Sequence, residues 1–328
     1  MRVLVRGAGI IGLACADELL RRGHDVQVVD PAPGRGASYA AAGMLSPAAE
    51  VWHGEEALLG FGMRSLALWP TLAERLGVPL RCGGSLLVGH DAGDVQLVER
   101  QVSLLQGLGA DATRLTSRDL RDREPRLSAR VVGGALLADD LSVDPRAVVA
   151  ALLSRVPVQP EATTADVTVL ATGTRLPTPY SRLVRGVRGE ILRARTEDPP
   201  ERVVRGWVQG EPVYVVPRDG GEVVIGATSE EHDGDPVVTL GGVLRLLGAA
   251  RTLLPELERA ELVEALARDR PGTADNLPLV GPTHEPGVLL AAGHFRHGVL
   301  LAPLTARLIA DHLESGHVEP ALDPRRHL

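Results

Sequence analysis

Two segments of the sequence place glycines where an anion could meet the start of a helix. The first is the run Gly7-Ala8-Gly9-Ile10-Ile11-Gly12, which joins an apolar stretch at residues 3–5 to a helix-type pattern at residues 10–22. In such a turn the first glycine permits the tight bend, the second lets the backbone approach a pyrophosphate, and the third lets the helix pack on the strand. Asp30 ends the next apolar run, where a carboxylate can bond a ribose diol. The pattern predicts dinucleotide binding and leaves both FAD and NAD open.

The second segment is Gly293-His294-Phe295-Arg296-His297-Gly298-Val299-Leu300, which leads from an apolar run at residues 288–292 into a helix-type pattern at residues 299–313. A helix N-terminus carries roughly half a positive charge, so this turn could stabilise the anionic edge of a reduced flavin. A surface turn with incidental histidines is the alternative. His294 and His297 have a spacing found in metal sites, but no carboxylate or cysteine cluster accompanies them. We therefore expect no metal.

Two further residues could recognise a carboxylate. Arg270 precedes Pro271-Gly272, a pair that predicts a turn and an extended, rigid arginine before it. A guanidinium fixed in this way binds a carboxylate through two parallel hydrogen bonds, although a surface ion pair is the commoner role of an isolated Arg-Pro-Gly. Tyr214 lies in an alternating strand pattern, so its ring points away from Val213 and Val215. The ordinary alternative for Tyr214 is a half-buried strand aromatic.

These residues require two kinds of sheet to position them. The pattern over residues 3–29 is strand, glycine turn, helix and strand, which predicts a right-handed parallel βαβ unit. β-rich runs at residues 213–216 and 223–225 flank the turn Arg218-Asp219-Gly220-Gly221, which predicts an antiparallel hairpin. Helical patterns at residues 55–76 and 145–155 and β-type runs at residues 85–88 and 167–170 complete the outline.

The predicted fold class is therefore α/β, with a Rossmann-type domain on a parallel sheet that an antiparallel-sheet substrate domain interrupts twice. We assign residues 1–75, 142–182 and 268–328 to the nucleotide domain, and residues 76–141 and 183–267 to the substrate domain. NAD dehydrogenases usually keep their nucleotide domain contiguous, so an assembly from three separated segments favours FAD.

Composition excludes several classes of protein. The chain has 328 residues and a net charge of -7, which argues against a nucleic-acid or anionic-membrane partner. All its basic residues are arginine, and the absence of lysine excludes Schiff-base chemistry and a phosphate-loop lysine. Cys15 and Cys82 show no metal or redox spacing, which is typical of reduced thiols. The sequence contains no signal-peptide pattern or long apolar run. We expect a cytoplasmic protein.

Taken together, these motifs resemble the D-amino-acid oxidase superfamily and, within it, the glycine oxidases of thiamine biosynthesis. Four segments carry the resemblance: the first glycine run, Ala40-Ala41-Ala42-Gly43-Met44-Leu45, Arg270-Pro271-Gly272-Thr273, and the stretch from Gly293 to Pro303. The first is common to many flavoproteins, and the last is specific. In order and spacing, the resemblance covers almost the whole chain.

By position, the resemblance implies that Arg270 clamps a substrate carboxylate, that Tyr214 assists it, and that Arg296 and Met44 complete the substrate wall. It also implies noncovalent FAD, because residues 266–268 are Leu-Ala-Arg where monomeric sarcosine oxidases carry a flavin-linking cysteine. The expected FAD contacts are Gly7, Gly9, Ile10, Ile11, Gly12, Asp30, Ser38, Ala42, Gly43, Met44, Val158, Gly173, His294, Phe295, Arg296, His297, Gly298, Val299 and Leu300.

The activity that the resemblance implies is oxidation of glycine to glyoxylate and ammonia, with molecular oxygen reduced to peroxide. A hydride passes to the flavin, so the protein supplies orientation and electrostatics, and we assign no catalytic acid or base. Sarcosine and small D-amino acids are expected substrates too, because a pocket rejects an added methylene by only about 1–3 kcal/mol. The resemblance leaves a homo-oligomer open.

One departure and several alternatives accompany this interpretation. Relatives usually place a strand and a three-stranded meander where this chain has only residues 156–166, so we expect the strand near Val158 without the meander. The alternatives are a sarcosine or D-amino-acid oxidase, a quinone-linked dehydrogenase of the same fold, a non-catalytic FAD-binding subunit and, last, an NAD dehydrogenase. The NAD dehydrogenase would leave the C-terminal turn unexplained.

Overall fold

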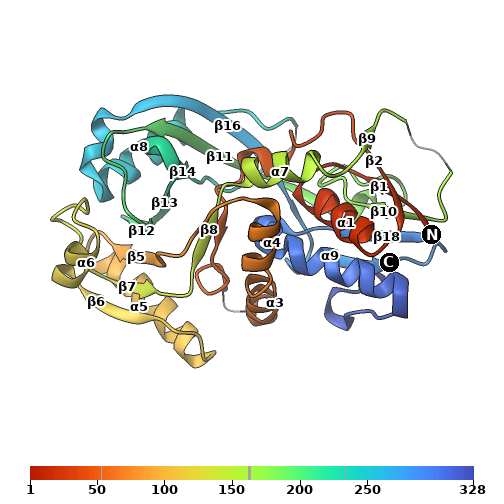
Figure 1. Cartoon of the computed structure of the whole chain (residues 1–328). Helices are drawn as coiled ribbons and strands as arrows, with labels where there is room; N and C mark the ends of the chain where they lie inside the picture. Colours follow the sequence, from red (N-terminus) through yellow and green to blue (C-terminus); the bar gives the residue numbers. More distant parts are fainter. Residues whose placement is uncertain (53, 162–163, 233) are drawn as a thin grey trace.

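The computed structural model describes residues 1–52, 54–161, 164–232 and 234–328. Two large sheets lie in different parts of the molecule, and both chain termini lie beside the parallel one (Figure 1). The predicted α/β fold class, with a parallel and an antiparallel sheet, is confirmed. Within the described residues, no helix combines the length and apolarity needed to cross a membrane.

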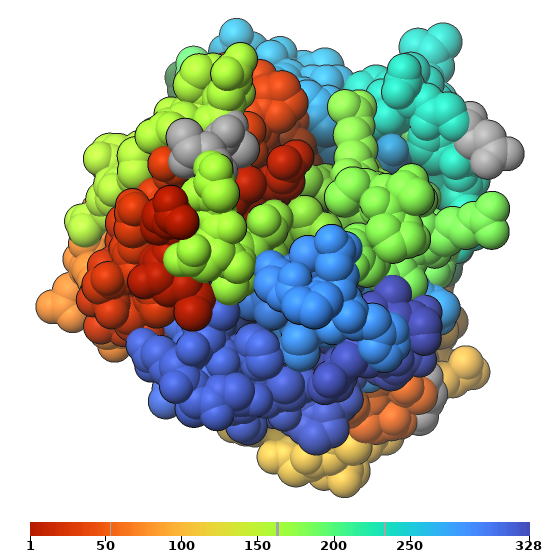
Figure 2. Space-filling view, turned by 90° about the vertical axis from the view of Figure 1, so that its right-hand side faces the viewer, coloured from red at the N-terminus to blue at the C-terminus, as the bar shows by residue number. Residues whose placement is uncertain are grey.

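The parallel sheet has the strand order β17-β18-β10-β1-β2-β9, and only β17 runs antiparallel to its neighbour. Its strands are β1 (Arg2–Arg6), β2 (Asp25–Val29), β9 (Val158–Gln159), β10 (Val167–Leu170), β17 (Leu279–Pro282) and β18 (Val288–Ala292). Strands from the beginning, middle and end of the sequence therefore form one sheet. Figure 2 shows the same three parts of the chain side by side on one face of the molecule.

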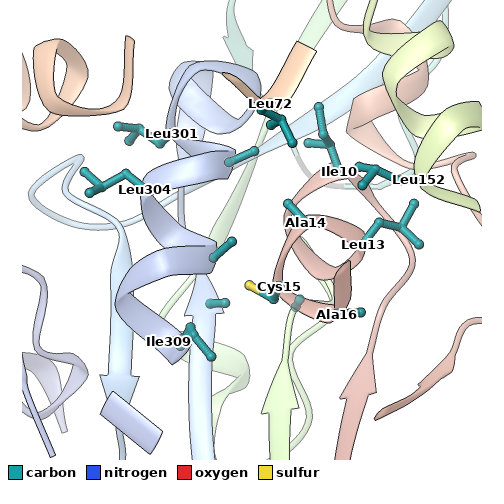
Figure 3. Close-up of a cluster of buried hydrophobic side chains, with 14 of the residues drawn as sticks. Ile10, Leu13, Ala14, Cys15, Ala16, Leu72, Leu152, Leu301, Leu304 and Ile309 are labelled. Carbon is teal, nitrogen blue, oxygen red and sulfur yellow. The ribbon is translucent and has the colours of Figure 1, made fainter. Parts of the chain in front are cut away.

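Three helices build the main core against this sheet. They are α1 (Ile10–Arg21), α7 (Pro145–Leu153) and α9 (Gly298–Ser315). Leu13, Cys15 and Leu19 of α1 are completely buried, because apolar residues recur there at helical spacing. Side chains of α1 meet those of α7 and α9 in this core, as Leu13, Leu152 and Ile309 show in Figure 3. The helix that begins after the second glycine turn thus packs directly on the helix that begins after the first.

The second sheet has the order β15-β11-β14-β13-β12-β5-β7-β6, and β16 also pairs with β11. Every pair is antiparallel except β12 with β5. Its strands are β5 (Ser85–Gly89), β6 (Thr113–Thr116), β7 (Gly133–Leu137), β11 (Arg185–Arg195), β12 (Val203–Val208), β13 (Glu211–Pro217), β14 (Glu222–Gly226), β15 (Glu230–Glu231) and β16 (Glu261–Gly272). The long strands β11 and β16 reach from this sheet toward the parallel one (Figure 1).

Smaller elements connect and cover the two sheets. A three-stranded sheet contains β3 (Met44–Leu45), β8 (Leu141–Val143) and β4 (Leu80–Arg81). The remaining helices are α2 (Ala37–Ala40), α3 (Glu56–Leu66), α4 (Trp69–Leu76), α5 (Ala92–Gly107), α6 (Ser117–Arg123) and α8 (Leu240–Leu253). The helical pattern at residues 55–76 therefore forms two helices, α3 and α4, rather than one. Trp69 of α4 is fully buried and donates to the carbonyl of Leu300, which fixes α4 against α9.

One local prediction is wrong. Arg270-Pro271-Gly272 does not form a turn: strand β16 continues through Gly272 and pairs residue by residue with Arg185–Val187. Proline is tolerated there because β11 is the one strand of the described chain that forms a ladder with β16; an isolated bridge also joins Gly272, the next residue, to His294. The strand also crosses the predicted domain boundary between residues 267 and 268. The division into domains otherwise stays a prediction.

Candidate functional site

A single cavity of about 990 Å³ runs between the carboxyl ends of the parallel strands and the face of the second sheet. Seventeen of the nineteen predicted FAD contacts line it, and so do Arg270 and Tyr214. The other two predicted contacts do not. Gly12 packs α1 on the glycine turn, since a Cβ there would overlap the carbonyl of Gly7. Val158 lies in β9 at the edge of the sheet, next to Val28 of β2.

The nucleotide end of the cavity is built mainly from backbone. Gly7 has a φ of +107°, and a Cβ there would overlap the carbonyl of Ala171, so only glycine fits this turn. Asp30 accepts hydrogen bonds from Ala8 N (2.6 Å) and Ala32 N (2.7 Å), which ties the turn to the end of β2. Ser38 Oγ accepts from Ile10 N at 3.0 Å, at the start of α1. Asp30 thus holds the turn as well as facing the cavity.

The C-terminal turn at residues 293–298 lines the cavity beside the end of β16, where His294 forms an isolated bridge with Gly272. Gly293 has a φ of +73°, and a Cβ there would overlap the methyl group of Thr273. Burial lowers the pKa of His294 to about 3 and that of His297 to about 4, so both rings are neutral at pH 7. His294 Nε2 contacts Thr305 Oγ1 at 2.9 Å. No cluster of His, Cys, Asp or Glu in the described part of the chain could hold a metal ion.

The substrate end is built from side chains that lie over glycines. A Cβ at Gly189 of β11 would overlap the guanidinium of Arg270, and a Cβ at Gly226 of β14 would overlap the phenol of Tyr214. Arg270 Nη1 donates to the carbonyl of Thr228 at 3.1 Å, and no carboxylate pairs with Arg270 within the described chain. Burial lowers the pKa of the Arg270 guanidinium and raises that of the Tyr214 phenol. A cation and a neutral hydroxyl therefore face the cavity together.

Arg296 also lines the cavity, but two carboxylates flank its guanidinium. Its Nε lies 3.7 Å from Oε2 of Glu50, and its Nη2 lies 3.9 Å from Oε2 of Glu55. About 29% of the Arg296 side chain stays exposed. Its charge is thus partly compensated by the protein itself, whereas that of Arg270 is available to a bound carboxylate.

Sequence reasoning missed Glu50, which lines the cavity with only 15% of its side chain exposed. Arg205 of β12, also missed, donates from Nη1 to Glu50 Oε1 at 2.8 Å and from Nη2 to the Ala49 carbonyl at 3.0 Å. Burial alone would raise the pKa of Glu50, but Arg205 and Arg296 outweigh it and lower that pKa to about 2. The available signal was weak: each residue is a single charge within an apolar run.

The residues of the cavity fit the FAD that the sequence predicts. The tight turn at Gly7 and the N-terminus of α1 leave open backbone where a pyrophosphate would lie, at the carboxyl edge of parallel strands. The N-terminus of α9 and the C-terminal turn line the same cavity as this turn and Tyr214. Gly7, Gly9, Asp30 and the 293–300 segment would hold the group there.

Comparisons with known proteins agree with this geometry. The chain is 31% identical to the glycine oxidase of Geobacillus kaustophilus, over 95% of this chain and 92% of that protein. It is 33% identical to a putative thiamine biosynthesis oxidoreductase ThiO of Rhizobium etli, over 98% of each chain. It also matches the bifunctional protein ThiO/ThiG of Trichormus variabilis at 33% identity, but spans only about 54% of that protein's length.

The fold comparison covers the whole chain. The crystal structure of the Geobacillus kaustophilus glycine oxidase superposes with a TM-score of 0.90 at 30% identity, over 100% of this chain and 99% of that one. Residues 2–312 match the family described as FAD dependent oxidoreductase, DAO. That match includes both sheets and every residue placed in the cavity above. The chain belongs to the DAO family of FAD dependent oxidoreductases.

Proposed function

We propose that this protein is a glycine oxidase, which converts glycine, oxygen and water into glyoxylate, ammonia and hydrogen peroxide. The observation that carries the proposal is the pairing of Arg270 and Tyr214 over Gly189 and Gly226, at the substrate end of an FAD-type cavity. The relatives named glycine oxidase support it, since they match this chain along almost its full length. Relatives named ThiO support a role in supplying thiamine biosynthesis.

The residues of the substrate end would act by binding and orientation. Arg270 is the cation for the substrate carboxylate, because its planar guanidinium donates two parallel hydrogen bonds and no protein carboxylate competes for it within the described chain. The Tyr214 hydroxyl donates a further bond from β13. FAD, when bound, supplies the acceptor for the hydride of the substrate's α-carbon. Fixing the carboxylate at two points sets the position of that α-carbon.

No side chain of the substrate end is needed as a proton acceptor at the α-carbon. Hydride transfer removes the hydrogen with its electrons, so the demand on the protein is geometric. The neutral His297 lies in the C-terminal turn, where its uncharged ring adds no cation beside the flavin position. We infer noncovalent FAD, because the cavity lining includes neither Cys15, which is buried in the core, nor Cys82.

Substrate choice would be steric and therefore moderate. The cavity lining that includes Arg270 also includes Met44, Ile191 and Tyr214, none of which carries a charge. An added methyl group changes binding by only about 1–3 kcal/mol in such a pocket. We therefore expect activity with sarcosine and small D-amino acids, at lower efficiency than with glycine.

Anaerobic reduction of the purified holoenzyme tests this function. Glycine, sarcosine, D-alanine and D-proline are mixed with the enzyme separately, and bleaching of the flavin is followed before oxygen is admitted. We expect rapid bleaching with glycine, followed by recovery of the oxidised spectrum and one peroxide per turnover. A flavin that glycine leaves oxidised would overturn the proposal. Bleaching without reoxidation by oxygen would instead indicate a dehydrogenase that uses another acceptor.

A further inference from the structure

The carboxylate of Glu50 has no role in the function proposed above, although it lines the same cavity as Arg270. We propose that Glu50 binds the amino group of the substrate, so that the site recognises both charged ends of an amino acid. This inference rests on the proposed function, since it names a second specificity-determining contact in the same pocket.

One oxygen of Glu50 is free to accept such a group. Oε1 accepts from Arg205 Nη1 at 2.8 Å, whereas Oε2 takes part in no hydrogen bond within the described chain. Arg296 Nε lies 3.7 Å from Oε2, which is beyond hydrogen-bond distance. A largely buried carboxylate that lines a cavity and keeps one acceptor unused has the chemistry to bind an ammonium or amine N–H.

The sheet register places Arg205, the residue that holds Glu50, on the side of Tyr214 opposite to Arg270. Strands β16, β11, β14, β13 and β12 follow one another across the sheet (Figure 1). Arg270 reaches from β16 over Gly189 of β11, and Tyr214 reaches from β13 over Gly226 of β14. Arg205 lies directly opposite Tyr214 on β12, so it shares that face of the sheet. Cation, phenol and anion therefore form a row.

The groups around Glu50 keep it a fixed anion. Arg205, Arg296 and His297 face it, and its charge also acts on Tyr214, Arg270 and Asp140. With its pKa lowered to about 2, the carboxylate does not take up the substrate's proton near neutral pH. Glu50 would thus orient the amino group without acting as a base. Arg205 is a positioning residue, since it holds Glu50 and does not itself line the cavity.

A matched pair of unreactive ligands tests the assignment. α-Aminoisobutyrate has no α-hydrogen, so the enzyme cannot oxidise it, and pivalate is the same shape with a methyl group in place of the ammonium. Each is titrated into the oxidised holoenzyme at pH 7, and its Kd is taken from the change in the flavin spectrum. The wild-type enzyme should bind α-aminoisobutyrate about tenfold or more tightly than pivalate, as expected for one added charged contact.

Glu50→Gln should remove about tenfold of that preference by weakening α-aminoisobutyrate alone, because glutamine keeps the shape and still accepts from Arg205. Glu50→Asp should recover part of it. Glu55→Gln is the matched control: Glu55 also lies beside Arg296, at 3.9 Å, but does not line the cavity, so the preference should stay unchanged.

Four results would overturn the assignment: a wild-type enzyme with no preference between the ligands, an unchanged preference in Glu50→Gln, an equal loss for both ligands, or no binding of either ligand by the wild-type enzyme. None of these measurements depends on turnover. A wild-type enzyme that shows the preference but is not reduced by glycine would contradict the proposed function and leave the Glu50 contact standing. An enzyme that glycine reduces but that binds the two ligands equally would support the proposed function and contradict the Glu50 contact.

Discussion

The two ends of the cavity are built in different ways. At the nucleotide end, the turn at Gly7 and the start of α1 belong to one short segment, and Asp30 and Ser38 bind its backbone. At the substrate end, the side chains come from strands far apart in the sequence and meet only because the second sheet pairs in one register. The cofactor, which many enzymes share, would thus bind mainly to backbone groups. The substrate would bind to side chains, and these can be substituted without changing the backbone at the nucleotide end.

If cofactor binding at the nucleotide end depends on backbone groups, then one methyl group added to that backbone should abolish flavin binding, which is the largest effect that we predict. We expect Gly7→Ala to purify without flavin absorbance, because position 7 needs a φ of +107° and has no room beside the Ala171 carbonyl. Gly60→Ala in α3 is the control, since a Cβ there meets nothing within 4 Å. The absorbance ratio at 450 and 280 nm measures occupancy. If the Gly7→Ala enzyme retains flavin, then flavin binding does not depend on the backbone conformation at residue 7.

Substitutions at the substrate end should have a different effect: they should weaken substrate binding and leave the flavin bound. We expect Arg270→Met to lower kcat/KM for glycine by roughly 10²–10³-fold, which corresponds to losing one partner of a desolvated charge pair. Flavin content should match the wild type, because Arg270 hydrogen-bonds to the Thr228 carbonyl and the Tyr214 hydroxyl, and not to the glycine turns of the nucleotide end. Steady-state peroxide formation and the flavin spectrum measure the two properties. Loss of flavin from this variant would mean that the two ends are not independent.

A glycine can also be substituted at the substrate end. This substitution tests whether a glycine there acts by leaving space for a side chain of another strand. We expect Gly226→Ala to displace the phenol of Tyr214 and to lower kcat/KM by about 10²-fold, as a shift of roughly 1 Å in a positioned group does. Gly133→Ala in β7 is the control: it also lies in a strand, but its Cβ would meet Val95 at an ordinary 3.5 Å. Equal activities of the two variants would contradict the assignment of Gly226 as the platform for Tyr214.

The same difference explains what the sequence could reveal. The turn at Gly7, the strands beside it and the C-terminal turn were predictable, because each depends on neighbouring residues. Gly189 and Gly226 were not, since their function depends on which side chain of another strand lies above them. Glu50 and Arg205 were missed for the same reason: no pattern in one strand specifies its partner.

Errors in the prediction follow the same division. Pro271-Gly272 was expected to turn, but pairing with β11 keeps the segment extended. Local preference is a weak guide where a neighbouring strand supplies the backbone hydrogen bonds. Gly12 and Val158 belong to elements that were placed correctly and lie off the cavity lining, so their contact with FAD stays a prediction.

The smallest expected effect concerns the C-terminal turn, where the two ends meet. His294 has a pKa lowered to about 3 by burial, below its ordinary value of 6.5. In the unfolded chain it takes up a proton near pH 6.5, whereas in the folded protein it does not until about pH 3. Its contribution to stability is therefore complete above pH 6.5 and is lost as the pH falls toward 3. Between pH 6.5 and 5 the loss is about 2 kcal/mol.

His294→Gln removes this titration and can keep the contact with Thr305 Oγ1. We expect the free energy of unfolding in urea to fall by about 2 kcal/mol less between pH 7 and pH 5 in this variant than in the wild type. His317→Gln, at an exposed position near the C-terminus, should behave like the wild type. Tryptophan fluorescence at the two pH values measures the difference. If His294→Gln loses as much stability on acidification as the wild type, then the turn is hydrated and the histidine ring reaches water.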